Sequence, residues 1–115
     1  MTFSAERPGV GNVCWLFSLI VDQGPGGHGR DELMSALAEA GVDTRPLFYP
    51  LHSMPLYHQY AANRQFPNTD WLAANGLSLP SAVTVSDAEI DYVCRMLVHL
   101  MVGRPRARAL EATQS

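Results

Sequence analysis

The longest apolar run in this chain is short. It extends from Val13 to Val21 and is interrupted by Ser18. A membrane-spanning helix needs roughly 18 or more consecutive apolar residues, so this run does not qualify as one. Its aromatic, β-branched and leucine residues favour a β-strand, and because they do not alternate with polar residues we expect the strand to be covered on both faces.

The composition is that of one small globular domain. Of the 115 residues, 47% are hydrophobic and 17% are charged, and the formal net charge is -3. A chain of this length forms one domain. Its weakly acidic balance lacks the basic footprint of a nucleic-acid-binding protein. We therefore expect neither a nucleic-acid partner nor a membrane partner.

The N-terminus and the cysteines favour a cytoplasmic protein. No charged segment followed by a long apolar stretch opens the chain, so a secretory signal is not expected. Cys14 and Cys94 lie far apart and outside any CxxC pattern. In a reducing compartment such cysteines are usually buried small apolar residues. We expect no disulfide framework.

Two segments have helical patterns with recognisable ends. Leu33 and Leu37 share one face of the first, and Gly41 is placed to close it in the left-handed conformation. The second begins with a capping box, in which Ser86 and Glu89 satisfy each other's backbone N–H groups. Apolar residues then recur at helical spacing until Gly103 and Pro105 end the helix.

Three shorter elements lie between these helices. An extended run is expected over Asp43–Tyr49, a short helix between Asn68 as N-cap and Gly76 as stop signal, and a brief strand over Leu77–Leu79. The order of strands and helices predicts an α+β fold with a small, mostly antiparallel sheet and helices packed on one face. We expect residues 1–12 to be a loose lead-in, residues 13–102 the folded domain, and residues 103–115 a disordered tail.

Four segments, in this order, resemble one known family. They are WLFSLIVD, RDELMSALAEAGVDTRPLFYPLH, FPNTDWLAANGLSLPS and SDAEIDYVC. They resemble the C-terminal domain of the DegT/DnrJ/EryC1/StrS sugar aminotransferases, and the perosamine-synthase-like branch is the most similar. Enzymes of this family use pyridoxal phosphate (PLP) to install amino groups on nucleotide-linked ketosugars. The resemblance implies the small C-terminal domain of a fold-type I aminotransferase.

The resemblance does not include the catalytic part of such an enzyme. Family members are several times longer, and their N-terminal domain carries the lysine that binds PLP. The eight basic residues of this chain are all arginines, so it contains no lysine. Because a Schiff base with PLP requires a lysine amine, we expect no cofactor in this chain and no activity from it alone.

The missing PLP-binding domain leads to an expectation about the origin and the partners of this chain. The chain is expected to be a fragment, or one half of a split aminotransferase. Its expected partners are a chain that carries the PLP domain or a second copy of itself. The complete enzyme would bind a nucleotide-linked sugar.

The segment TRPLFYPLH carries the candidate substrate contacts. In the family the matching stretch runs beside the active-site cleft, so the resemblance implies that Arg45 and His52 line the sugar or amino-donor pocket. It implies Tyr49 and Tyr57 as wall residues. An arginine presents a planar fork of donors suited to a carboxylate or phosphate. Two other interpretations stay open: an ion pair between Arg45 and Asp43 on the strand surface, and packing roles for the tyrosines. None of these residues is expected to be catalytic.

Other site patterns do not match. The spacing of His52 and His58 fits no zinc pattern, and GPGGHG lacks the spacing of a dinucleotide or phosphate-binding loop. Two alternative functions remain open. One is a non-catalytic module that binds a nucleotide sugar. The other is a protein-interaction module that uses an apolar surface left exposed without the PLP domain.

Overall fold

The computed structural model describes residues 1–22 and 29–102 of the chain. Residues 23–28, which include most of the GPGGHG segment, and the tail predicted for residues 103–115 lie outside the described residues. So do Gly103 and Pro105, the expected end of the last helix.

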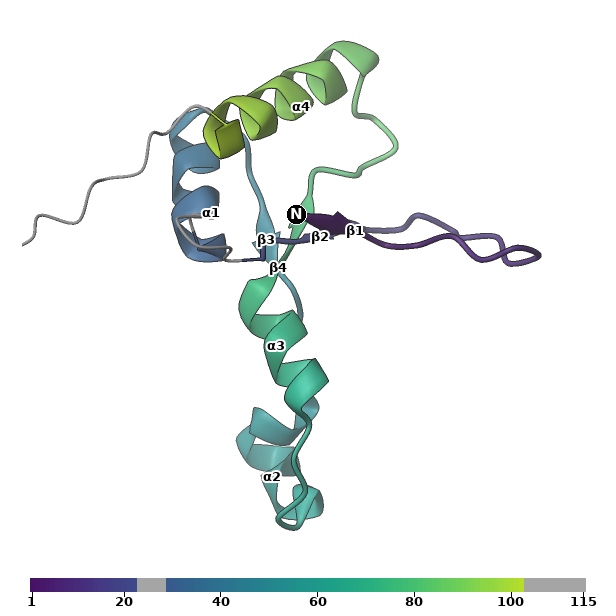
Figure 1. Cartoon of the computed structure of the whole chain (residues 1–115), viewed down its shortest axis with the longest axis vertical. Helices are drawn as coiled ribbons and strands as arrows, with labels where there is room; N and C mark the ends of the chain where they lie inside the picture. Colours follow the sequence, from purple (N-terminus) through teal and green to yellow (C-terminus); the bar gives the residue numbers. More distant parts are fainter. Residues whose placement is uncertain (23–28, 103–115) are drawn as a thin grey trace, which may run out of the picture.

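Four strands, four α-helices and one short 3-10 turn make up the described part of the chain (Figure 1). The strands are β1 (Thr2–Phe3), β2 (Phe17–Ile20), β3 (Arg45–Pro46) and β4 (Gly76–Leu79). The helices are α1 (Arg30–Glu39), α2 (Pro55–Ala61), α3 (Pro67–Asn75) and α4 (Asp87–Val102), and the turn η1 (Leu51–Ser53) precedes α2. This is the α+β class that the sequence predicts.

The four strands form one antiparallel sheet in the order β1-β2-β4-β3. Leu19 of β2 is paired with Leu77 of β4, and both side chains are buried. The neighbouring pair, Ser18 and Ser78, points to the opposite face, because side chains alternate along a strand. The two serine hydroxyls lie 3.0 Å apart and share a hydrogen bond.

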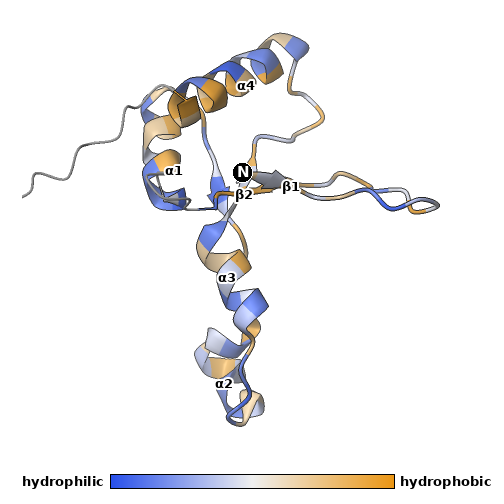
Figure 2. Ribbon diagram, viewed as in Figure 1, coloured by the Kyte–Doolittle hydropathy of each residue, from blue (hydrophilic) through white to orange (hydrophobic). Residues whose placement is uncertain are grey.

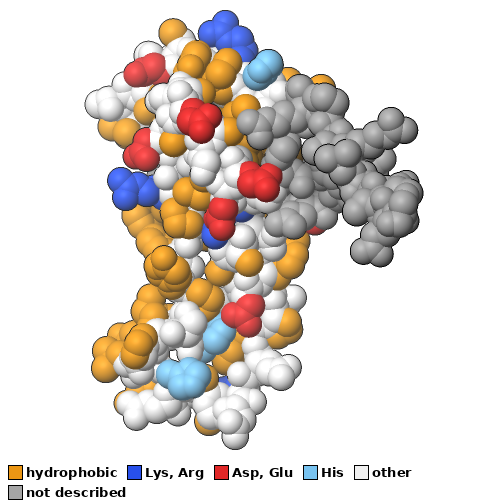
Figure 3. Space-filling model, turned by 90° about the vertical axis from the view of Figure 1, so that its left-hand side faces the viewer, with side chains coloured by type: hydrophobic (Ala, Val, Ile, Leu, Met, Phe, Trp, Pro, Cys, Tyr) orange, Lys and Arg blue, Asp and Glu red, His pale blue; other side chains and the backbone are white. Residues whose placement is uncertain are grey.

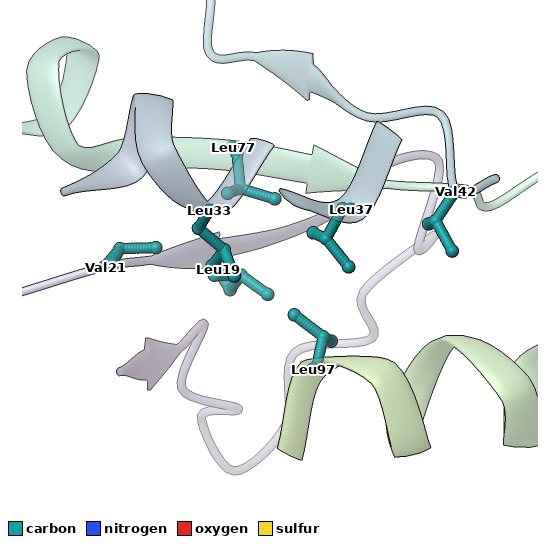
Figure 4. Close-up of a cluster of buried hydrophobic side chains, with 7 residues drawn as sticks. All are labelled: Leu19, Val21, Leu33, Leu37, Val42, Leu77 and Leu97. Atoms are coloured by element: carbon teal, nitrogen blue, oxygen red, sulfur yellow. The ribbon is translucent and has the colours of Figure 1, made fainter. Parts of the chain in front are cut away.

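The hydrophobic core lies between the sheet, α1 and α4 (Figure 4). Its buried members are Leu19, Val21, Leu33, Leu37, Val42, Leu77 and Leu97. The predicted apolar face of α1 thus points into the core. Helices α1 and α4 pack on this face of the sheet, whereas α3 and α2 continue beyond the start of β4 (Figure 1).

The end of α1 has the backbone pattern of a Schellman motif. Gly41 has a φ of 79°, which is the left-handed conformation predicted for it. Its N–H donates to the carbonyl of Ala38, and the N–H of Val42 donates to the carbonyl of Leu37 at 2.8 Å. Because Val42 and Leu37 both lie in the core, the chain reversal is fixed by hydrogen bonds and by apolar contact together.

The start of α4 has the predicted capping box. The backbone N–H of Ser86 donates to Glu89 Oε2 at 2.7 Å, and the backbone N–H of Glu89 donates to Ser86 Oγ at 3.3 Å. The hydroxyl of Ser86 also donates to Glu89 Oε2 at 2.8 Å. The two hydrogen bonds from Ser86 lower the pKa of Glu89 below its ordinary value of 4.5.

The region of α2 and α3 differs from the sequence prediction. Helix α2 was not predicted, because its seven residues are fewer than the roughly 11 over which helical periodicity is recognised. Both helices have a mixed hydropathy in Figure 2, unlike the recurring hydrophobic residues of α4. Asn68 was expected as the N-cap of α3, which is wrong. Phe66 is the N-cap, and Pro67 takes the first helical position, where its missing N–H costs no hydrogen bond.

The strands are shorter than the apolar runs predict. Residues 13–16 precede β2, and Trp15 is exposed, as is Phe17 within the strand, so full coverage of both faces is wrong. The expected extended run over residues 43–49 pairs only at Arg45 and Pro46. Within the expected lead-in, residues 2–3 form β1. The two cysteines were expected to be buried, but both are exposed.

Arg30 connects the start of α1 to the junction of α3 and β4. Its guanidinium donates from Nη1 to the carbonyl oxygens of Ala73 at 2.5 Å and Gly76 at 3.3 Å. Its Nε donates to Asp31 at 2.8 Å. The positive charge therefore lies at the C-terminal end of α3, where free carbonyl groups and the helix dipole favour a cation.

No helix in the described ranges has both the length and the apolar character needed to cross a membrane.

Gly76 is expected to tolerate no larger residue. A Cβ at this position would lie 2.7 Å from the carbonyl oxygen of Leu72 and would overlap the side chain of Leu47. We predict that Gly76→Ala lowers the free energy of unfolding by about 1–3 kcal/mol, as overpacking does elsewhere. Urea titration measures this. The control is Gly11→Ala, because a Cβ on Gly11 meets nothing within 4 Å. Equal stabilities of the two variants would contradict the close packing at Gly76.

The capping box predicts a pH dependence of stability. The pKa of Glu89 is lower in the folded chain than its ordinary value of 4.5. Its contribution to stability is therefore present above that value and is lost as the pH falls through the lower folded pKa. We predict that Glu89→Gln lowers the melting temperature at neutral pH and that the difference from wild type shrinks in acid. Glu6→Gln, in the N-terminal segment, is the control. A difference that stays constant with pH would contradict this role of Glu89.

Candidate functional site

A groove of about 720 Å³ lies beside β3 and the end of β4. Three segments form its walls: residues 15–16, residue 43 and residues 45–49 together with Met54, and residues 78–82. We call it the β3 groove. It contains two of the four residues predicted to contact substrate, Arg45 and Tyr49.

Arg45 is held only loosely in the β3 groove. Its guanidinium lies 3.7 Å from the carboxylate of Asp43, and the two side chains are 81% and 84% exposed. The ion pair considered as an alternative at this position therefore exists. Pairs so exposed are worth about 0–1 kcal/mol. The pair thus leaves the guanidinium accessible to another anion.

Aromatic side chains adjoin Arg45. Trp15 and Phe48 lie face to face, with ring centroids 6.4 Å apart and an interplanar angle of 29°. Both are exposed, and so is Tyr49. Phe48 is an apolar residue that lies outside the hydrophobic core. No local pattern indicates its pairing with Trp15, because β2 and β3 are brought together by the sheet.

His52 lies in a different place. Its Nε2 is 2.7 Å from Asp70 Oδ1 of α3, and its ring stacks on Phe66 with centroids 4.8 Å apart. Its carbonyl oxygen is 3.1 Å from Nδ1 of His58 in α2. These contacts join η1, α2 and α3, so the histidine links three elements in this arrangement.

The structure thus divides the four candidate residues into two pairs. Arg45 and Tyr49 share the β3 groove, whereas His52 and Tyr57 are not among its lining residues. Tyr57 is an exposed residue of α2. No cluster of three or more His, Cys, Asp or Glu side chains that could hold a metal ion occurs in the part of the chain that the structure describes.

Comparison with known proteins establishes the family. The sequence model of the DegT/DnrJ/EryC1/StrS aminotransferase family matches residues 1–98. The chain belongs to this family. It is similar to the GDP-perosamine synthase of Vibrio cholerae, with 33% identity over 97 residues, which are 84% of this chain and 26% of that protein. It is also similar to the GDP-perosamine synthase of Escherichia coli O157:H7, with 30% identity over 92 residues, which are 80% of this chain and 24% of that protein.

A solved structure gives the same result for the fold. A chain described as a sugar aminotransferase from Streptococcus pneumoniae, in its PMP form, has a TM-score of 0.58 and 25% identity with this protein. The match covers 70% of this chain and 20% of the solved one. The protein therefore spans about a quarter of the length of the curated relatives it matches. The predicted family resemblance and the predicted α+β class are both confirmed.

The contact between His52 and Asp70 predicts an energetic coupling. We expect a double-mutant cycle of His52→Ala and Asp70→Ala to give a coupling near the upper end of about 0.2–1 kcal/mol. The histidine side chain is 22% exposed and the two atoms are 2.7 Å apart, so solvent screens the pair incompletely. Urea unfolding of the four proteins measures the coupling. The same cycle on Arg45 and Asp43 is the control and is expected to give a value near zero. Equal couplings in the two cycles would contradict the structural role of His52.

Proposed function

We propose that this chain is the small C-terminal domain of a PLP-dependent nucleotide-sugar aminotransferase, and that the β3 groove forms one wall of its substrate pocket. The observation that carries the proposal is the exposed guanidinium of Arg45 in a groove that is also lined by aromatic side chains, in a chain of the sugar aminotransferase family. Its similarity to two GDP-perosamine synthases supports a nucleotide-linked sugar as the substrate class.

Arg45 is the proposed anion contact of the pocket. A nucleotide sugar carries a diphosphate, and a guanidinium binds phosphate oxygens through two parallel hydrogen bonds. Replacing Asp43 by a phosphate as the partner of Arg45 costs little free energy, because the contact between Arg45 and Asp43 is long and exposed. The phosphate would replace the carboxylate of Asp43 as the acceptor.

Tyr49 and its aromatic neighbours are the proposed apolar contacts. Tyr49 offers a ring face and a hydroxyl group, both of which suit a sugar or a base. Trp15 and Phe48 add a second aromatic surface at the same groove. His52 and Tyr57 would then contribute through the arrangement of α2 and α3 rather than from the wall of the β3 groove.

The residues of this chain do not fit PLP. The family's cofactor is held through a lysine, and these 115 residues include none. The lysine and the PLP site must therefore belong to polypeptide outside these residues, either in the same protein or in a separate chain. We also propose a cytoplasmic location, which agrees with the two free cysteines.

The exposed apolar surface favours association with that polypeptide. Trp15, Phe48 and Tyr49 are 71%, 74% and 75% exposed. Figure 3 shows hydrophobic side chains gathered along one edge of the molecule, from its middle to its lower end. Apolar surface of this kind marks a contact with another protein surface. A protein-interaction module without enzymatic activity would use the same surface. An activity measurement therefore distinguishes the aminotransferase domain from the interaction module.

The proposal is tested by a transaminase assay. With PLP, glutamate and a nucleotide-linked 4-ketosugar, we expect no turnover from this chain alone and turnover when a polypeptide carrying the PLP domain is added. Turnover by the chain alone would contradict the argument from the missing lysine. Association without turnover, seen as a size change in the mixture, would favour the interaction module instead.

Within the active mixture, Arg45→Ala is expected to raise KM for the nucleotide sugar by about tenfold or more, because hydrogen bonds to charged groups are worth about 1.5–3 kcal/mol. The value of kcat is expected to change less, since the guanidinium binds the substrate and not the reacting atoms. Arg95→Ala is the matched control, because Arg95 is an exposed arginine of α4 outside the β3 groove. An unchanged KM for Arg45→Ala would contradict the proposal that Arg45 contacts the nucleotide sugar.

A further inference from the structure

A second cavity, of about 390 Å³, lies between α4 and the ends of β2 and β4. We call it the α4 cavity. Its walls are mostly apolar and include Phe17, Leu79 and Val93. Cys14 and Cys94 also line it, and both are free and exposed. Two residues that are far apart in the sequence thus reach one cavity.

We propose that Cys14 and Cys94 are a redox-active pair that forms an intramolecular disulfide across the α4 cavity under oxidising conditions. This proposal does not rest on the proposed function, because neither cysteine lines the β3 groove. It assigns a modification site to residues that the sequence predicts to be buried and outside any disulfide framework.

Cys14 is the member of the pair that can move. Its φ is 49°, which is the left-handed conformation. This conformation is unfavourable in free energy for any residue other than glycine. Its backbone N–H donates to Asn12 Oδ1 at 2.8 Å, so a contact within the same segment holds this conformation. The segment between β1 and β2 projects from the sheet (Figure 1), and Cys14 lies near its return to β2. A change of conformation at Cys14 therefore relieves strain without unpairing the sheet.

Cys94 is the fixed member of the pair. It belongs to the 16-residue helix α4, which is anchored by Leu97 in the core and by the capping box at its start. A disulfide requires Cα atoms within about 7 Å of each other. The disulfide therefore requires Cys14 to come within this distance of Cys94, by a movement of the N-terminal segment toward α4.

The chemistry needs one oxidant, for which hydrogen peroxide serves. One thiolate attacks the O–O bond, so that its sulfur becomes a sulfenic acid and a hydroxide leaves and is protonated to water. The second thiolate attacks the sulfenic sulfur, forms the S–S bond and releases a second water. Two thiols lose two electrons and two protons, and the peroxide is reduced to two water molecules. A small thiol such as glutathione reverses the reaction.

Peptide mapping tests the proposal directly on the full chain. Trypsin cleaves at arginine here, since lysine is absent, and it places the two cysteines in separate peptides, residues 1–30 and 65–95. After peroxide treatment of dilute protein, we expect these peptides joined under non-reducing conditions, in the monomer fraction, at a rate independent of protein concentration. The intact chain should lose the mass of two hydrogen atoms, and a reductant should restore it.

Two variants make the result decisive. Cys14→Ser and Cys94→Ser are each expected to keep the circular dichroism spectrum of wild type and to abolish the joined peptide. In each variant the remaining cysteine should accumulate as sulfenic acid or higher oxides, because it has no resolving thiol. Joined peptides found only in covalent dimers would overturn the proposal. Oxidation of both cysteines in wild type without a joined peptide would overturn it as well, and so would two thiols that remain reduced.

Discussion

The fold depends on the backbone around Gly76, where α3 ends and β4 begins. The carbonyl oxygen of Gly76 accepts hydrogen bonds from the N–H of Leu47 at 3.2 Å and from the guanidinium of Arg30 at 3.3 Å. Just before it, the carbonyl of Asn75 accepts from the N–H of Val21 at 2.9 Å. Four segments therefore meet at two consecutive peptide units, and Leu47 comes this close because Gly76 has no side chain. This junction aligns β4 between β2 and β3, and so determines which residues reach the core and which reach the β3 groove.

The parts of the fold that the sequence predicts are those with local signals. The end of α1 depends on Gly41 and its immediate neighbours, and the start of α4 depends on Ser86 and Glu89 three residues later, so a short window contains the necessary information. The core face of α1 follows from helical periodicity in the same way. Helix α2 is too short, at seven residues, to give such a pattern. Likewise, the contacts of Arg30 join segments far apart in the chain, and no local rule predicts them.

The same difference between local signals and contacts of distant segments applies to the candidate site. The family resemblance identifies the segment from Thr44 to His52 but does not give the direction of its side chains. The turn η1 follows Pro50, and after it the chain no longer runs along the sheet. Arg45, before the turn, lines the β3 groove, whereas His52, within it, packs against Phe66 and bonds to Asp70. A continuous extended strand would have placed both residues along one edge of the sheet. The turn separates them, and this is why only part of the predicted set of residues shares a groove.

The proposed association with a larger enzyme depends on the exposure of the aromatic residues. The core is made from leucine and valine, while Trp15, Phe48 and Tyr49 remain accessible around the β3 groove. Aromatic side chains offer the largest gain on burial, so a chain that leaves them exposed has that free energy still available for binding. Its relatives are roughly three times as long as these 115 residues, and ligand sites favour the boundary between two domains. A second surface placed over the β3 groove would bury these rings and enclose Arg45. Under the proposed function, the same contact would both stabilise the domain and complete the pocket, so that stability and substrate binding would depend on one interaction.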